Sequence, residues 1–127
     1  MSVNSHSPTT VLVVEDDPAL RMLCRVNLEL ENYRVLEAET VTRAGELLTS
    51  EPIDVVLLDL HVGDRRGTDL LPVLRAERPG AAVCLLSGTS ESEPPEEEGV
   101  HDFIRKPFDL EELTATVRRL ASQAVRH

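Results

Sequence analysis

Three strongly apolar runs are the feature of this sequence that most constrains its fold. They lie at Thr10–Val14, Ile53–Leu58 and Ala81–Leu86, and each is followed at once by an acidic or hydroxyl side chain. Apolar runs of this length, rich in β-branched residues, are typical of strands that a parallel sheet buries on both faces. Because parallel neighbours must be joined by long crossovers, usually helices, we expect an α/β domain.

The segments between these runs carry helix and strand signals in alternation. Asp17 followed by Pro18 pairs an N-cap carboxylate with a proline at the first helical position, and this helix is expected to reach about Glu31. The further predicted elements are a strand at Tyr33–Glu37, a helix capped by Thr40, a helix over Thr68–Glu77, a strand at His101–Arg105 and a helix capped by Asp109. Five strands alternating with helices predict an open, doubly wound parallel sheet with the flavodoxin-like strand order 2-1-3-4-5.

The segment Ser90–Gly99 fits this alternation poorly. It contains two adjacent prolines and five glutamates at the place where a helix between the fourth and fifth strands is expected. Proline removes helical hydrogen bonds and clashes with the preceding turn, so we predict a short or irregular fourth helix.

Length and charge limit the classes of function. The chain has 127 residues and a formal net charge of −10, which suits one domain, expected at 9–127 after a flexible lead-in at 1–8. A surface this acidic repels phosphate backbones and anionic lipids, which argues against direct binding to nucleic acid or membranes. The lead-in lacks the apolar centre of a signal peptide, so we expect a cytoplasmic protein. In that reducing compartment, Cys24 and Cys84 are expected to be buried thiols.

Charged and hydroxyl side chains stand at the ends of four predicted strands. They are Glu15, Asp16, Asp59, Ser87 and Lys106. The carboxyl ends of parallel strands form the ligand crevice of an open α/β sheet, so we expect these side chains to meet there. Three carboxylates in one crevice repel one another unless a cation intervenes, and such oxygen ligands suit Mg²⁺. A hydroxyl and an ammonium opposite the metal would complete a site that holds a phosphoryl group against one carboxylate nucleophile.

Each of these residues has a simpler interpretation when it is taken alone. Acids at strand ends commonly cap the next helix, which is the expected role of Asp17. A single serine such as Ser87 is commonly a turn hydroxyl, and a single lysine such as Lys106 commonly extends into solvent. Taken together, however, charged or hydroxyl residues at the ends of several strands favour the interpretation as a phosphoryl-binding site.

The motifs LVVEDDP, VVLLDL, LLSG and FIRKPF, in this order and spacing, resemble the receiver domain of two-component response regulators. The similarity covers about residues 10–124. It implies that Asp59 is the phosphoacceptor and that a histidine kinase or histidine phosphotransfer protein is the phosphoryl donor. It also implies that Asp16, Asp59 and the backbone carbonyl of His61 bind Mg²⁺, with Glu15 acting mostly through water.

The same resemblance implies a switch. Ser87 matches the hydroxyl that closes onto the phosphoryl group, and Lys106 matches the lysine that pairs with it. Phe103 falls where the family carries a rotating aromatic side chain, and because it has no hydroxyl any rotamer change would depend on burial. The Lys106–Pro107 peptide falls where the family has a cis bond. Such a domain is not an enzyme in its own right, because phosphorylation shifts an equilibrium and so changes binding to an output partner.

Two regions depart from the pattern of the family. After the phosphoacceptor the family often has methionine or leucine and then proline, whereas Val62 and Gly63 stand here, and glycine gives this loop more freedom. The family commonly binds its output partner through a face made by the fourth helix, fifth strand and fifth helix. If the fourth helix is short here, this chain is not expected to use that face in the same way.

An alternative contact face lies on the first helix. Met22, Val26 and Leu30 form an i, i+4, i+8 row beside its core stripe, so we hypothesise that this edge binds a partner. The simpler interpretation of the row is a wider buried stripe.

Three other functions stay open at this point. A degenerate receiver would bind partners without phosphorylation. A small phosphohydrolase would use Asp59 as its covalent nucleophile, although such enzymes usually need an acid where His61 stands. A nucleotide- or flavin-binding module would need a phosphate loop, and neither GxGxxG nor GxxxxGK occurs in the sequence. The sequence does not decide whether the chain is a stand-alone regulator or an excised domain. It also leaves open whether the protein is a monomer or a homodimer.

Overall fold

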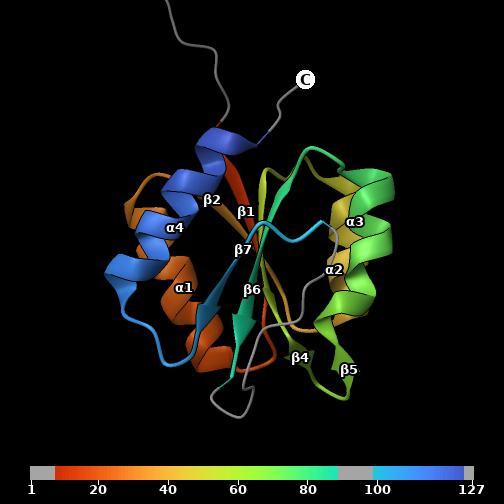
Figure 1. Ribbon diagram of the computed structural model, residues 1–127, viewed down its shortest axis with the longest axis horizontal. Coiled ribbons are helices and arrows are strands. Elements are labelled where there is room, and N and C mark those ends of the chain that lie inside the picture. Colours follow the sequence, from red (N-terminus) through yellow and green to blue (C-terminus); the bar gives the residue numbers. More distant parts are fainter. Residues whose placement is uncertain (1–7, 89–98, 125–127) are drawn as a thin grey trace, which may run out of the picture.

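The structure, a computed structural model, describes residues 8–88 and 99–124 (Figure 1). Its centre is a five-stranded parallel sheet with the order β2-β1-β3-β6-β7, which confirms the predicted flavodoxin-like strand order. The strands are β1 (Thr10–Val14), β2 (Arg34–Ala38), β3 (Val55–Asp59), β6 (Ala82–Ser87) and β7 (Asp102–Arg105). The second strand therefore begins one residue later than the sequence predicts.

Within the described part of the chain, two helices cover each face of the sheet (Figure 1). On one face lie α1 (Pro18–Leu30) and α4 (Leu110–Gln123), and on the other lie α2 (Val41–Ser50) and α3 (Leu71–Glu77). Successive residues of a strand point to opposite faces, so Val13 packs into the core under α1 and α4 while Val14 packs into the core under α2 and α3. Both cores are aliphatic, as the continuous apolar runs require.

The predicted helix starts are confirmed by their caps. Each capping side chain accepts a backbone N–H two or three residues on: Asp17 from Ala19 at 3.0 Å, Thr40 from Arg43 at 3.0 Å and Asp109 from Glu112 at 2.7 Å. A cap of this kind stabilises a helix by about 1 kcal/mol. The first cap starts α1 directly after the acidic pair that follows β1.

The chain after β3 differs from the predicted loop. His61–Val62 (β4) pairs antiparallel with Arg65–Arg66 (β5) in a short hairpin. Gly63 in its turn has φ +64°, a left-handed conformation that favours glycine in tight hairpins. The sequence showed the glycine but no alternation of apolar and polar residues from which the hairpin could be predicted.

The prediction of a helix over Thr68–Glu77 is wrong for the first turn of that range. Residues Gly67–Leu70 form a 3₁₀ turn, and α3 begins only at Leu71. Pro72 occupies the first turn of α3, where a missing N–H leaves no intrahelical bond unmade.

The apolar row on α1 is exposed. Met22, Val26 and Leu30 are 55%, 41% and 74% exposed, so the interpretation of the row as a wider buried stripe is wrong. Its role as a partner surface stays a prediction.

Both cysteines are buried free thiols, as predicted. Burial raises the pKa of Cys24 to about 11 and that of Cys84 to about 12, so neither forms a thiolate readily. The predicted short or irregular fourth helix falls almost wholly in 89–98, outside the described residues. Among the residues that the structure does describe, no helix has the length and apolarity needed to span a membrane.

Candidate functional site

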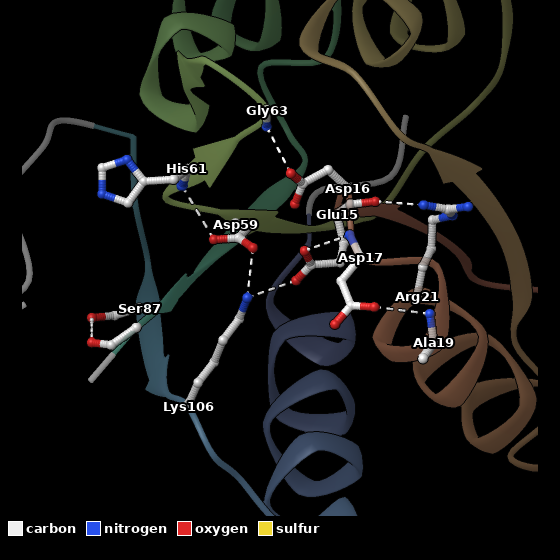
Figure 2. A network of polar contacts seen from close by, with 11 residues as sticks. Glu15, Asp16, Asp17, Ala19, Arg21, Asp59, His61, Gly63, Ser87 and Lys106 are labelled. Atoms are coloured by element: carbon white, nitrogen blue, oxygen red, sulfur yellow. Dashed lines mark hydrogen bonds and ion pairs between the residues drawn. The ribbon is translucent and has the colours of Figure 1, made fainter. Parts of the chain in front are cut away.

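Four predicted site residues stand at the carboxyl ends of four strands, along one edge of the sheet (Figure 2). Glu15 directly follows β1, Asp59 ends β3 and Ser87 ends β6. Lys106 directly follows β7, and its backbone N–H donates to the Ser87 carbonyl at 2.7 Å, which extends the pairing of β6 and β7. The parallel register therefore brings together residues that lie up to ninety-one positions apart in the sequence.

An ammonium group links two buried carboxylates at the centre of the site. Nζ of Lys106 donates to Glu15 Oε1 at 2.7 Å and to Asp59 Oδ2 at 2.5 Å. The Glu15 residue is 1% exposed and the Asp59 residue 5% exposed. Burying two carboxylates without a cation would be costly, so the lysine is part of what allows them to lie together.

Burial and neighbouring charges shift the pKa values of Glu15 and Lys106. Burial, together with the neighbouring Asp59, raises the pKa of Glu15 from 4.5 to about 7, although the hydrogen bond from Lys106 opposes the shift. Burial tends to lower the pKa of Lys106, but its hydrogen bonds with Asp59 and Glu15 outweigh burial and raise it. The lysine is therefore charged at neutral pH, whereas Glu15 titrates near neutrality.

Asp16 lies beside this pair and is exposed. Its Oδ2 accepts the N–H of Gly63 from the β4–β5 hairpin at 2.9 Å. Its slight burial tends to raise its pKa, but the N–H of Gly63 and a hydrogen bond with Glu15 outweigh burial, and the pKa of Asp16 is lowered. Asp16 is thus a charged carboxylate at neutral pH.

The carboxylates of Glu15, Asp16 and Asp59 form what we call the acidic cluster. One oxygen from each lies within 4.8 Å of the other two. Mg²⁺ prefers oxygen ligands, is commonly bound through one or two carboxylates and keeps several waters. Three carboxylates at this spacing therefore fit a hard divalent cation.

The hairpin after β3 orients the central carboxylate. The N–H of His61 donates to Asp59 Oδ1 at 3.1 Å, and the imidazole points away from the carboxylates (Figure 2). Gly63 donates its N–H to Asp16 and takes a left-handed conformation in the hairpin, and the added freedom of a glycine in this loop stays a prediction. The His61 carbonyl as a metal ligand stays a prediction.

Ser87 and Phe103 are the two predicted switch residues, and they lie on β6 and β7. The buried Ser87 hydroxyl donates to the Gly88 carbonyl at 3.4 Å and lies apart from Asp59 in Figure 2. Phe103 lies on β7 with its side chain exposed. Their switch roles stay predictions. The Lys106–Pro107 peptide is cis, as the resemblance implied.

The structure adds supporting residues that sequence patterns did not reveal. The N–H of Asp17 donates to Glu15 Oε2 at 3.1 Å, and Nη1 of Arg21 donates to the Glu15 carbonyl at 2.7 Å. Gly67 packs so closely on the Asp59 carbonyl that a Cβ at this position would overlap it. Gly67 directly follows β5, so its close approach to Asp59 comes with a hairpin that the sequence did not predict.

Comparison with known proteins agrees with this geometry. The family model described as the response regulator receiver domain matches residues 11–118. The chain is 34% identical over 112 residues to the transcriptional regulatory protein KdpE of Mycobacterium tuberculosis and 36% identical over 113 residues to KdpE of Escherichia coli. In both cases the match covers 87% of this chain and 50% of the relative, so the chain spans about half the length of these curated relatives.

Solved structures share the fold. A CheY-like receiver domain protein from Methanospirillum hungatei is 26% identical with a TM-score of 0.80, covering 92% of this chain and 97% of that one. The receiver domain of the sensor histidine kinase PA1611 from Pseudomonas aeruginosa has a TM-score of 0.81 at 21% identity, covering 91% of this chain and 99% of that one. That crystal structure has a magnesium ion coordinated in its active site cleft. The match to the family model, together with the five-stranded sheet and its acidic edge, shows that this chain belongs to the response regulator receiver domain family.

Proposed function

We propose that this chain is a phosphoacceptor that takes a phosphoryl group onto Asp59 in the presence of Mg²⁺. The observation that carries the proposal is the position of Asp59 at the centre of the site. Its carboxylate lies 2.5 Å from the Lys106 ammonium and within 4.8 Å of oxygens from two further acids. This arrangement offers one nucleophilic carboxylate among groups that can hold a cation and an anion at once.

The donor in this proposal is a phosphohistidine on a histidine kinase or a histidine phosphotransfer protein. An oxygen of Asp59 attacks the phosphorus, and a P–O bond forms while the P–N bond of the donor breaks. The donor imidazole leaves with the bonding electron pair and takes up a proton. The products are an aspartyl phosphate on this chain and a neutral histidine on the donor.

Each site residue has a proposed role in that step. Asp16, Asp59 and the His61 carbonyl would hold Mg²⁺, with Glu15 acting mostly through water. The bound cation would supply positive charge against the phosphoryl oxygens. Lys106 would pair with a phosphoryl oxygen in addition to Asp59, to which it is already bonded.

The aspartyl phosphate would act as a switch for partner binding. The Ser87 hydroxyl, now bonded to the Gly88 carbonyl, would turn to the phosphoryl group, and Phe103 would follow. The output partner would recognise the state so favoured, because phosphorylation contributes a free-energy difference between two forms of the domain.

Intact mass after incubation with acetyl phosphate and Mg²⁺ tests the chemistry. We expect the wild-type chain to gain the mass of one phosphoryl group and Asp59→Asn to gain none. Asp54→Asn is the matched control, because Asp54 directly precedes the same strand at its opposite end and accepts the N–H of Thr10 at 2.9 Å. The Asp54 variant should be labelled like the wild type.

Two results would contradict the proposal. A folded wild-type chain that takes no label would be a degenerate receiver that binds partners without phosphorylation. Steady turnover of a phosphomonoester, lost in Asp59→Asn, would instead show a phosphohydrolase.

A further inference from the structure

Arg21, on the second turn of α1, reaches back to the loop that carries two members of the acidic cluster (Figure 2). Its Nη1 donates to the backbone carbonyl of Glu15 at 2.7 Å, and its side chain is largely buried. The Nε of the same guanidinium donates to Oε1 of Glu37, on β2, at 3.3 Å. Arg21 therefore ties the loop after β1 to the neighbouring strand.

The Glu37 carboxylate fixes the guanidinium in this position. One of its oxygens contacts Arg21, and the other forms an ion pair with Nε of Arg25 at 3.0 Å, one helical turn further along α1. A planar guanidinium with donors in fixed directions can serve a carboxylate and a carbonyl together, which a lysine ammonium does with less geometric control. The contact with Glu15 is thus directional as well as electrostatic.

The main chain of Glu15 is held on both sides by these contacts. Its N–H donates to the Ala38 carbonyl of β2 at 3.0 Å, and its carbonyl accepts from Arg21. The peptide between Glu15 and Asp16 is therefore oriented by contacts that involve neither of the two carboxylates. That peptide determines where the Asp16 carboxylate points, and Asp16 meets the N–H of Gly63 from the other side.

We propose that Arg21 is a positioning residue for the divalent cation of this site, which acts by fixing the Glu15–Asp16 peptide. The inference rests on the proposed function, because it assumes that the acidic cluster binds Mg²⁺. Arg21 is not a ligand itself, since a cationic side chain cannot coordinate a metal ion. It lowers the cost of binding by keeping Asp16 beside Asp59 when the cation is absent.

Cation affinity measured on matched variants tests this inference. Mn²⁺, which takes the same oxygen ligands as Mg²⁺, can be titrated into the full chain while the free ion is followed by electron paramagnetic resonance. We expect Arg21→Gln to weaken Mn²⁺ binding by about tenfold, the scale seen when a partner behind a metal ligand is removed. Arg25→Gln removes the same charge from a residue that also pairs with Glu37. Its affinity should stay within about twofold of wild type, as for a partly exposed ion pair.

Arg21→Lys separates position from charge. Lysine keeps the positive charge but lacks the fork that reaches both Glu37 and the Glu15 carbonyl, so we expect an intermediate affinity for Mn²⁺. Thermal unfolding of each variant without metal shows whether the fold is intact. Should Arg21→Gln fail to fold, the Lys variant takes its place against Arg25→Gln.

The inference is overturned if folded Arg21→Gln, or the Lys variant in its place, binds Mn²⁺ as tightly as wild type. It is also overturned if Arg25→Gln loses as much affinity as Arg21→Gln, because the loss would then not depend on the contact between Arg21 and the Glu15 carbonyl. The proposed function fails separately, and the inference with it, if the wild-type chain neither binds Mn²⁺ nor is phosphorylated.

Discussion

Glu15 links the pH of the solution to the stability of the fold. Its pKa is raised from 4.5 to about 7, first by burial and then by Asp59, so the folded chain holds this proton more tightly than the unfolded chain. The resulting contribution to the free energy of unfolding is full below about pH 4.5 and is lost as the pH rises through about 7. Urea unfolding of the metal-free protein across this range should show stability falling with pH.

The Glu15→Gln variant isolates this contribution. Glutamine has a similar shape and does not titrate, so the fall in stability between about pH 4.5 and 7 should be smaller in the variant. An equal fall in both proteins would show that other groups cause it.

Gly67 limits what can stand beside the phosphoacceptor. A Cβ at this position would overlap the backbone oxygen of Asp59, so Gly67→Ala must displace the chain there. We expect a loss of about 1–3 kcal/mol in the free energy of unfolding, the usual cost of overpacking, and slower labelling by acetyl phosphate. Urea unfolding and intact mass measure the two effects.

The matched control is Gly45→Ala in α2. A Cβ there would meet no atom within 4 Å, and alanine favours a helix over glycine by about 1 kcal/mol. The control should therefore be slightly more stable than wild type and should be labelled at the same rate. Equal behaviour of the two variants would contradict the assigned role of Gly67.

At the scale of single residues, the sequence predicted the charged side chains of the site better than the residues that position them. Glu15 and Asp59 could be placed because each stands where a recognisable apolar strand ends, and Lys106 because it follows the short predicted strand His101–Arg105. Arg21 and Gly67 act through backbone contacts, and no composition or spacing distinguishes an arginine that reaches a carbonyl from one that extends into solvent. Their roles required the three-dimensional register.

The exposed row on α1 allows a prediction at the scale of an element. Met22 and Val26 are exposed, so replacing both with alanine should change the free energy of unfolding by no more than about 0.5 kcal/mol each. Leu28→Ala on the buried side of the same helix should cost about 2–5 kcal/mol. Urea unfolding distinguishes the two sides of the helix.

The same double variant tests the hypothesis of a partner surface. Transfer from a phosphohistidine donor protein should slow, whereas labelling by acetyl phosphate, which needs no docking surface, should not. The hypothesis would be rejected if the double variant accepts the phosphoryl group from the donor protein at the wild-type rate and binds every partner as tightly as wild type.

The elements were predictable where one local signal decides the structure. Continuous apolar runs gave the buried strands, and Asp17, Thr40 and Asp109 gave three helix starts. The β4–β5 hairpin has only two residues in each strand, too few to show a period. The 3₁₀ turn before α3 begins at Gly67, which packs against the Asp59 carbonyl, and no local pattern shows such a tertiary contact.

For the whole molecule, the acidic cluster predicts that Mg²⁺ stabilises the fold. A ligand that binds only the folded chain adds about 2.7 kcal/mol to the free energy of unfolding at a concentration 100 times its Kd. Thermal unfolding with Mg²⁺, compared with KCl of equal ionic strength, should show this gain beyond the screening of the net charge of −10. Asp16→Asn should lose most of the difference between Mg²⁺ and KCl, and an undiminished difference would place the cation elsewhere.

The order in which the chain leaves the ribosome gives Lys106 a further significance. The three acids belong to residues 15–59, whereas the ammonium that contacts two of them follows the last strand of the sheet. During synthesis, the three carboxylates are therefore present well before the Lys106 ammonium, which helps two of them to be buried together. The buried arrangement of Glu15 and Asp59 around one ammonium is therefore complete only in a chain that extends past β7 to Lys106.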